Sequence, residues 1–359
     1  MARARDLGIV IGSGTPGPNN AITDVSGVQV GYATVIEGSD VRTGVTLIVP
    51  FDGKPALFAG THRLNGCGEM TGLEWIRESG MITSPIAITN THSVGAVYSA
   101  LIAHAVSDGD DLRPLPWSLP VVAETWDGRL NDINGMHVRA EHVEEAFADL
   151  RSGPVAEGNV GGGTGMVCHG FKGGTGTASR VLDAGAGGYT VGVLVQANHG
   201  RRQRLQINGV PVGEQLSPED VPLPGAALSP QGSIIVVVAT DAPLLPGQCD
   251  RLAQRAGLGI ARTGGAGETT SGDLFIAFAT GNRNLIQQGE PAPVSVPVQM
   301  LQDSFINHLF YAVIEATEEA IVNALLAAET MTGKGGVTAH RLEAERLIEI
   351  MTRFGRRVT

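Results

Sequence analysis

The chain has 359 residues, of which 42% are hydrophobic and 17% charged, and 50 are glycine. This composition is typical of a compact globular protein with a large core and excludes an intrinsically disordered chain. The formal net charge of −11 argues against nucleic acid as a partner, because phosphate contacts need clustered Lys and Arg.

Short apolar runs typical of strands alternate along the chain with amphipathic stretches typical of helices. Most strand-like runs are apolar on both faces, as in strands that are covered on both sides. With no internal repeat or long linker, the pattern predicts one layered α/β domain of residues 1–359. In chain order we expect strands at 27–36 and 44–51, a helix at 71–78, a strand at 85–89, a helix at 93–106, a strand at 119–125, a helix at 141–150, strands at 189–198 and 233–240, a helix at 249–256, a strand at 274–280, and two helices or one bent helix at 304–330.

One extended loop, rich in Pro and Gly, covers 208–232. Loops this long in compact domains are usually functional or mobile. The loop ends at Gly232, and the next strand opens with Ser233. Taken alone, this pair is typical of a turn in which the serine satisfies a local backbone group.

The cysteines Cys67, Cys168 and Cys249 lie far apart, and none belongs to a CxxC motif. They indicate neither a disulfide framework nor a zinc knuckle. The N-terminal apolar run is shorter than the roughly 7–15 residues of a secretory signal. No window approaches the ~20 apolar residues of a membrane helix, so we expect a cytoplasmic protein that does not enter a membrane.

Two glycine clusters, at 161–167 and 170–179, resemble nucleotide-binding loops only superficially. Neither contains G-x-G-x-x-G, and Lys172 lacks the neighbours that a P-loop requires. We therefore expect tight turns there instead of a phosphate site. No histidine stands at a metal-ligand spacing from another His or Cys, so no metal or other cofactor is expected. A Ser-His-Asp triad remains open, because its parts need not be close in sequence, although no G-x-S-x-G is present.

Polar residues stand at the ends of several expected core strands. Each one alone is typical of a cap or a turn. Together they supply carboxylates, an amide and hydroxyls at strand ends, where sites are commonly built. The residues are Glu124, Asn198, Ser233, Ser271 and Asp273.

Taken together, these features resemble the family of β-peptidyl aminopeptidases and L-aminopeptidase–D-esterases, the DmpA-type peptidases. The resemblance covers nearly the whole chain in order, and it is more specific to the family than to a substrate. The stretches that carry it are 19–35, 60–80, 85–97, 124–138, 157–166, 191–200, 231–244, 270–282 and 323–333.

The resemblance implies a four-layer α-β-β-α sandwich like that of the N-terminal nucleophile hydrolases, with its own connectivity. It also implies an inactive precursor that cuts its own backbone between a Gly and a Ser. These residues fall on Gly232 and Ser233, which would divide the domain into fragments 1–232 and 233–359. Ser233 would then become a chain terminus, with its own amine as general base.

The resemblance also assigns roles to the strand-end residues. The oxyanion-binding Asn falls on Asn198, and the second serine and its acid fall on Ser271 and Asp273. That acid is Glu in some relatives, so Asp273 is shorter by one methylene. The Glu that receives the substrate's ammonium group falls on Glu124, for which a salt bridge to a resident Arg such as Arg129 is the structural alternative.

A tyrosine found near the nucleophile in some relatives falls on Trp126. Tryptophan has no hydroxyl, so an acid role cannot transfer. Trp126 could wall the pocket or donate its indole N–H.

The implied function is an aminopeptidase that releases N-terminal residues from short peptides, amides or esters of β-, L- or D-amino acids. The partner is a small substrate, and a homo-oligomer of cleaved heterodimers is expected. One alternative is acyl transfer on a similar architecture, although the nucleophile there is Thr and here it is Ser233. Another alternative is a non-enzymatic protein that binds a small amine, or a structural oligomer. An uncleaved chain in denaturing mass analysis would favour this last reading.

Overall fold

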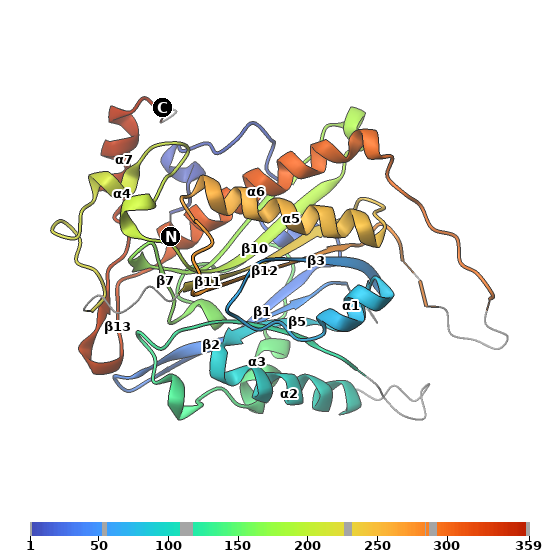
Figure 1. Ribbon diagram of the computed structural model, residues 1–359, viewed down its shortest axis with the longest axis horizontal. Helices are drawn as coiled ribbons and strands as arrows, with labels where there is room; N and C mark the ends of the chain where they lie inside the picture. The colour runs from blue at the N-terminus through green and yellow to red at the C-terminus, as the bar shows by residue number, and fades with distance from the viewer. Residues whose placement is uncertain are drawn as a thin grey trace.

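A computed structural model describes residues 2–51, 56–107, 118–225, 232–283, 285–286 and 293–356. Two β-sheets lie face to face at the centre, and helices cover the outer face of each sheet (Figure 1). The layers therefore run helix, sheet, sheet, helix, and the four-layer α-β-β-α prediction is confirmed.

The larger sheet has six strands, and its central three carry most of the candidate residues. β11 is parallel to β12 and antiparallel to β10. The end of β10 therefore lies beside the starts of β11 and β12, at one edge of the sheet. In spatial order the strands are β4 (Met81–Ile82), β3 (Leu57–Gly66), β12 (Ser271–Ala279), β11 (Gly232–Thr240), β10 (Thr190–Asn198) and β9 (Gly174–Val181).

The smaller sheet has four strands, of which β5 and β6 are parallel. Helix α2 (Val94–Ser107) follows β5 and, with α3 (Ala140–Ala148), covers the outer face of this sheet. The strand order is β1 (Gln29–Glu37), β2 (Val41–Val49), β5 (Ile86–Asn90) and β6 (Val121–Thr125).

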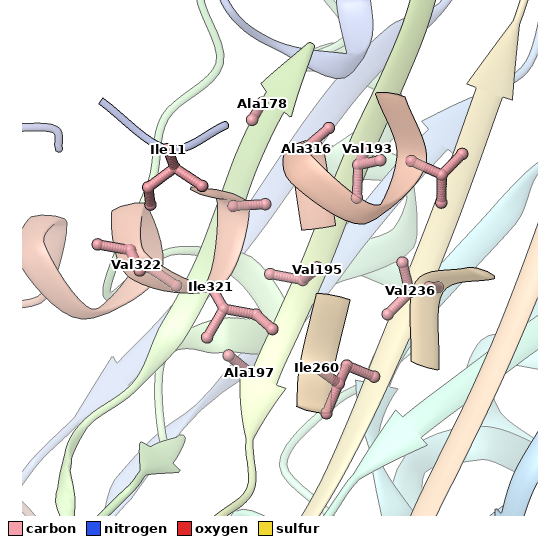
Figure 2. Packing of buried hydrophobic residues seen from close by; sticks show 14 of the residues in the cluster. Ile11, Ala178, Val193, Val195, Ala197, Val236, Ile260, Ala316, Ile321 and Val322 are labelled. Carbon is pink, nitrogen blue, oxygen red and sulfur yellow. The ribbon is translucent and has the colours of Figure 1, made fainter. Parts of the chain in front are cut away.

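Two long helices, α5 (Pro246–Arg262) and α6 (Ile306–Ala327), cover the outer face of the six-stranded sheet. Figure 2 shows this interface, where Ile321 of α6 and Ile260 of α5 lie over Val195 and Val236, and Val322 of α6 lies toward Ile11. Two further clusters of buried apolar residues fill the space between the sheets and the space under α2 and α3. Each of the three interfaces between layers thus has its own core.

Side-chain alternation assigns each strand residue to one of these interfaces. In β11, Ile234 and Val236 belong to the helix-facing cluster, whereas Ile235 and Val237 belong to the cluster between the sheets. Both faces are buried, which explains why the sequence reads as an unbroken apolar run.

Smaller elements complete the described chain. They are α1 (Leu73–Ser79), α4 (Val212–Gln215), α7 (Ala344–Arg353), the pair β7 (Val167–Cys168) and β8 (Phe171–Lys172), the pair β13 (Met331–Thr332) and β14 (Thr338–Ala339), and several short 3₁₀ turns.

None of the helices in the described ranges combines the length and apolar character that a membrane-spanning helix needs.

All seven strands expected from the sequence are present, with boundaries that differ by a few residues. Two long strands, β3 and β9, were missed, as were the two-residue strands β4, β7, β8, β13 and β14. The glycine cluster at 170–179, interpreted as turns, contains most of β9. A Cβ at Gly176 would lie 2.0 Å from the carbonyl oxygen of Ala320, so β9 needs glycine where α6 packs directly on it.

Two of the expected helices also differ from the structure, and α7 was not expected at all. α5 extends beyond the expected 249–256 at both ends, and Gly257 and Gly259 lie inside it instead of ending it. A Cβ at Gly259 would meet Thr317 at 2.6 Å, so this glycine permits close helix packing and does not end the helix. The segment 304–330 forms the single helix α6, and the interpretation as two helices is wrong. Of the loop 208–232, residues 226–231 lie outside the described ranges.

Candidate active site

Four polar residues identified from the sequence lie at the same end of three neighbouring strands of the six-stranded sheet. Asn198 is the last residue of β10, and Ser233 is the second residue of β11. Ser271 and Asp273 are the first and third residues of β12. Ser233 lies opposite Asn198 of β10 on one side and opposite Gly272 of β12 on the other. Neighbouring strands lie about 4.8 Å apart, so all four residues fall within two strand spacings.

Ser233 is held inside a continuous strand. β11 runs through the Gly232–Ser233 peptide bond, and the Ser233 Oγ accepts a hydrogen bond of 3.0 Å from the Gly272 N–H. A Cβ at position 232 would lie 2.7 Å from the carbonyl oxygen of Asn198 and 3.1 Å from the Cα of His199. Only glycine therefore fits at position 232 without displacing β10.

The Asn198 side chain has a defined orientation. Its Oδ1 accepts from the Val167 N–H at 2.8 Å, and its Nδ2 donates to the Trp126 carbonyl oxygen at 2.9 Å. One partner can only donate and the other can only accept, so the positions of the amide oxygen and nitrogen are settled. The Nδ2 group carries two hydrogens, and one remains for a further acceptor.

Ser271 and Asp273 form a hydrogen-bonded pair. The Ser271 Oγ donates to the Asp273 Oδ1 at 2.6 Å. Burial raises the pKa of Asp273 to about 6, against the hydrogen bonds from Ser271 and the Ile234 N–H, which favour the carboxylate. The negative charge of Glu268 raises this pKa further. Asp273 therefore contacts the backbone immediately after Ser233.

The pair lies on a different face of the sheet from the Ser233 hydroxyl. Ser233 alternates in phase with Ile235, which faces the other sheet. Ser271 and Asp273 alternate in phase with Phe275, which faces the helices. The Ser233 hydroxyl and the Ser271–Asp273 pair lie at the same end of the sheet, and the backbone at the start of β11 lies between them.

Glu124 comes from the other sheet, near the end of β6, and is 2% exposed. Its carboxylate accepts a hydrogen bond of 3.0 Å from the Glu69 N–H and another from the Thr91 hydroxyl. Burial raises the pKa of Glu124, and these two hydrogen bonds oppose the shift. Two donors leave part of the carboxylate's capacity for hydrogen bonds unused.

The backbone at Gly68 lies between the Glu124 carboxylate and Gly272, the residue that pairs with Ser233. A Cβ at Gly68 would lie 3.0 Å from the Cα of Gly272 and 3.1 Å from the Glu124 Oε1. Within the described ranges Glu124 forms no ion pair with Arg or Lys, and Arg129 instead donates to the Pro224 carbonyl oxygen at 2.8 Å. The salt-bridge alternative to Arg129 is therefore wrong.

A cavity of about 330 Å³ opens at this edge. Its described lining reaches Gly232 but includes neither Ser233 nor Glu124. The other site residues named from the sequence line the cavity: Trp126, Asn198, Ser271 and Asp273.

Several groups at the site were missed by sequence reasoning. The N–H groups of Val167 and Gly272 hold Asn198 and Ser233, and backbone groups carry no residue signature. Thr91 and Glu69 hold Glu124, and both lie in stretches that carried the family resemblance. Arg129 had been considered only as a partner of Glu124, whereas it lines the cavity.

The chain is similar over most of its length to known proteins. The model of peptidase family S58 matches residues 20–339. The chain is 48% identical to the beta-peptidyl aminopeptidase BapA of Sphingosinicella microcystinivorans, in an alignment that covers 99% of this chain and 93% of the relative.

Two solved structures are similar over nearly their whole length. A Burkholderia sp. beta-aminopeptidase superposes with a TM-score of 0.92 at 53% identity, covering 99% of each chain. The L-aminopeptidase D-Ala-esterase/amidase of Ochrobactrum anthropi, described as a serine aminopeptidase with a variant Ntn hydrolase fold, superposes with a TM-score of 0.90 at 44% identity, covering 100% of each chain.

Proposed function

The chain belongs to peptidase family S58 and is an aminopeptidase, and we propose that Ser233 is its nucleophile once the chain has cleaved its own Gly232–Ser233 bond. The observation that carries the proposal is the position of Ser233 in the register, between Asn198 and the Ser271–Asp273 pair. Cleavage would give fragments 1–232 and 233–359. Until then the nitrogen of Ser233 is an amide and cannot act as a base.

After cleavage the Ser233 amine, with an ordinary pKa of about 7.7–8.0, is partly neutral near pH 7. The Ser233 Oγ attacks the substrate's carbonyl carbon while its proton moves to this amine. The carbonyl oxygen becomes an oxyanion, to which the second hydrogen of the Asn198 Nδ2 donates. The C–N bond then breaks, the leaving amine takes the proton, and water hydrolyses the acyl ester of Ser233.

The new amine would stand at the sheet edge, where the Ser271–Asp273 pair meets the start of β11. This placement supports a role for Ser271 in holding the amine, with the Ser271 hydroxyl donating a hydrogen bond of 2.6 Å to Asp273. The Ser233 hydroxyl, on the other face, is left free to meet the substrate near Asn198.

Glu124 is proposed to receive the ammonium group of the substrate. A buried carboxylate is costly unless a cation meets it, and no resident cation among the described residues does so. The neighbouring cavity of about 330 Å³, whose lining includes Asn198 but neither Ser233 nor Glu124, has room for the rest of a short peptide, amide or ester. Anilides of β-Ala, L-Ala and D-Ala, compared by kcat/KM, will rank β-, L- and D-residues at the N-terminus.

For the proposed ammonium site we expect N-acetylation to remove most of the activity toward a β-Ala anilide, because an acetamide carries no charge. Glu124→Gln keeps the shape of the side chain and removes its charge. It should lower kcat/KM for the free amine by a factor that corresponds to a loss of about 1.5–3 kcal/mol of transition-state stabilisation, the size of a charged hydrogen bond. The measurement is kcat/KM for the free and acetylated anilide in both proteins.

Glu157→Gln is the matched control, because Glu157 is also a buried carboxylate but already pairs with a resident cation, Arg3, at 2.7 Å. It should leave the preference for the free amine intact. Equal cleavage of the acetylated and free substrates by the wild-type enzyme would contradict the ammonium site.

Asp273 gives a stability prediction for the uncleaved chain. Its pKa is about 6 in the fold and about 3.9 when unfolded, so the folded state binds the proton more tightly. Protonated Asp273 therefore favours folding below about pH 4, and that advantage disappears as the pH rises through 6. The test compares two chains that both carry Ser233→Ala, one of which also carries Asp273→Asn. As the pH rises from about 4 to above 6, the free energy of unfolding of the Asp273→Asn variant should increase relative to that of the chain with Asp273 by on the order of 2–3 kcal/mol.

Denaturant unfolding of the two proteins between about pH 4 and pH 8 measures this difference. Asp183→Asn, at an exposed loop position, is the control and should show no such trend. A stability difference at position 273 that is the same at every pH would show that the Asp273 carboxyl has an ordinary pKa.

We also propose that the cleaved heterodimers associate further. Several large apolar side chains near the start of α6 are exposed, among them Met300, Phe305 and Tyr311. Burying such side chains against a second copy would stabilise an oligomer. Sedimentation of the mature enzyme tests this, and a single heterodimer at micromolar concentration would contradict it.

A further inference from the structure

A cluster of three potential metal ligands lies beside the oxyanion-binding candidate. Cys168 ends β7, His169 follows it, and His199 follows Asn198 at the end of β10. One ligand atom from each lies within 4.8 Å of the others, and the Cys168 Sγ is 3.8 Å from the His199 Nδ1. In a tetrahedral zinc site, with bonds of 2.3 Å to sulfur and 2.0–2.1 Å to nitrogen, such atoms lie roughly 3.5 Å apart.

The two imidazoles have unused nitrogens inside the protein. The His169 Nδ1 lies 3.1 Å from the carbonyl oxygen of Arg201, which can only accept, so Nδ1 carries the hydrogen and Nε2 carries the lone pair. That Nε2 and the His199 Nε2 are buried without a hydrogen-bond partner among the described residues. His169 is fully buried, and His199 is 5% exposed.

The hydrogen bond from His169 to a backbone carbonyl is the arrangement that usually orients a metal-binding histidine. His169 also has a φ of 49°, in the left-handed region that is uncommon for residues other than glycine. A buried lone pair on a residue held in such a conformation is costly unless something binds it.

The charges around the cluster fit a thiolate–metal pair. The Arg202 Nε donates to the carbonyl oxygen of His169 at 3.1 Å, so a positive charge lies beside the cluster. A bound metal deprotonates a ligating thiol outright, releasing the proton to water, and the thiolate supplies the negative charge that a cation needs beside Arg202.

We propose that Cys168, His169 and His199 bind one divalent cation of the Zn²⁺ class, which enters from the substrate cavity and lowers peptidase turnover when bound. One sulfur and two imidazole nitrogens favour a borderline-soft ion over Mg²⁺ or Ca²⁺. The entry path is provided by Gly170, His199 and Gly200, which line the cavity. Three protein ligands leave a fourth position for water.

The coupling to turnover follows from chain connectivity. Cys168 adjoins Val167, whose N–H holds the Asn198 Oδ1 at 2.8 Å, and His199 adjoins Asn198 itself. The ligand atoms lie within 4.8 Å of one another, and a bound metal would draw them to separations of roughly 3.5 Å. This movement shifts both segments that orient Asn198. An oxyanion donor displaced by a fraction of an ångström loses much of its effect.

The test is a Co²⁺ titration of the chelator-treated mature enzyme, followed by absorbance. We expect one equivalent of Co²⁺ to give a near-ultraviolet thiolate charge-transfer band with the visible bands of tetrahedral Co²⁺, and Zn²⁺ to displace it. Cys168→Ser should abolish the charge-transfer band. His169→Asn tolerates the left-handed backbone and should weaken Co²⁺ binding more than about 10-fold.

Cys249→Ser and Cys67→Ser are the matched controls. Cys249 is buried elsewhere against the Phe58 carbonyl oxygen, and Cys67 is exposed, so both variants should keep the band. The absence of a thiolate band in wild-type protein at millimolar Co²⁺, or a band that survives Cys168→Ser, would overturn the site.

A kinetic measurement tests the coupling separately. Zn²⁺ should inhibit anilide hydrolysis by the wild-type enzyme and by Cys249→Ser, and inhibition of His169→Asn should need at least about 10-fold more Zn²⁺. Metal binding without any change in turnover would keep the site and overturn its coupling to Asn198. Because the absorbance does not depend on catalysis, failure of the metal site and failure of the proposed nucleophile are distinguishable.

Discussion

A Ser233→Ala chain is expected to remain one intact polypeptide and to lack measurable aminopeptidase activity. The substitution removes the only atom proposed to attack both the Gly232–Ser233 bond and the substrate. Without cleavage, the nitrogen of residue 233 also stays an amide, so nucleophile and base are lost together. The loss of turnover should be on the order of 10⁴-fold or more. Denaturing mass analysis will show whether fragments 1–232 and 233–359 are present, and anilide hydrolysis will report activity.

Ser179→Ala is the matched control, because Ser179 is also a buried serine in a strand of the same sheet, β9. Its Oγ donates to Asp24 at 2.6 Å and accepts from the Gly17 N–H at 3.0 Å, away from the cavity. This variant should lose some stability but still be cleaved and active. If Ser233→Ala still yields a fragment beginning at residue 233, self-cleavage by Ser233 is wrong.

Asn198→Ala should lower turnover by about 10²–10³-fold, the typical cost of removing one oxyanion donor. The variant also leaves the Val167 N–H and the Trp126 carbonyl without their partner, which should cost about 1–3 kcal/mol of folding stability. Because the same donor would serve self-cleavage, turnover must be normalised to the amount of cleaved chain. The measurements are kcat per cleaved chain and the free energy of unfolding.

Asn323→Ala separates the two effects. Asn323 is a buried amide in α6 that donates to the Thr177 carbonyl oxygen and accepts from the Ala4 N–H, each at 3.0 Å. Its loss should cost comparable stability and leave kcat unchanged. Full turnover in a folded, cleaved Asn198→Ala enzyme would remove Asn198 from the mechanism.

The sequence by itself determined the buried strands and the layered class. A strand covered on both faces must be apolar throughout, so runs such as 191–197 and 234–239 announce their environment locally. The resemblance then pointed to the residues at the ends of these strands, and the spacing of Ser271 and Asp273 already placed both on one face of a strand. Their hydrogen bond of 2.6 Å follows from that spacing.

The sequence was misleading where a glycine serves a distant partner. Gly176 and Gly259 read locally as turn or break signals, because glycine weakens an isolated strand or helix. In the fold, both lie where α6 makes close backbone contact, with β9 in one case and α5 in the other. Such a requirement belongs to a pair of elements far apart in the chain, so neither segment alone reveals it.

Only the tertiary structure decided which of these groups meet and in what electrostatic state. The order and register of β10, β11 and β12 bring Asn198 beside Ser233, and the packing of the sheets buries Glu124 without an ion pair among the described residues. The same folding brings His199 to Cys168 and His169, 30 or more positions away in the sequence, where no local spacing predicted a metal site. Burial and proximity shift pKa values and create ligand sets, and both arise only when separate segments exclude water from one another.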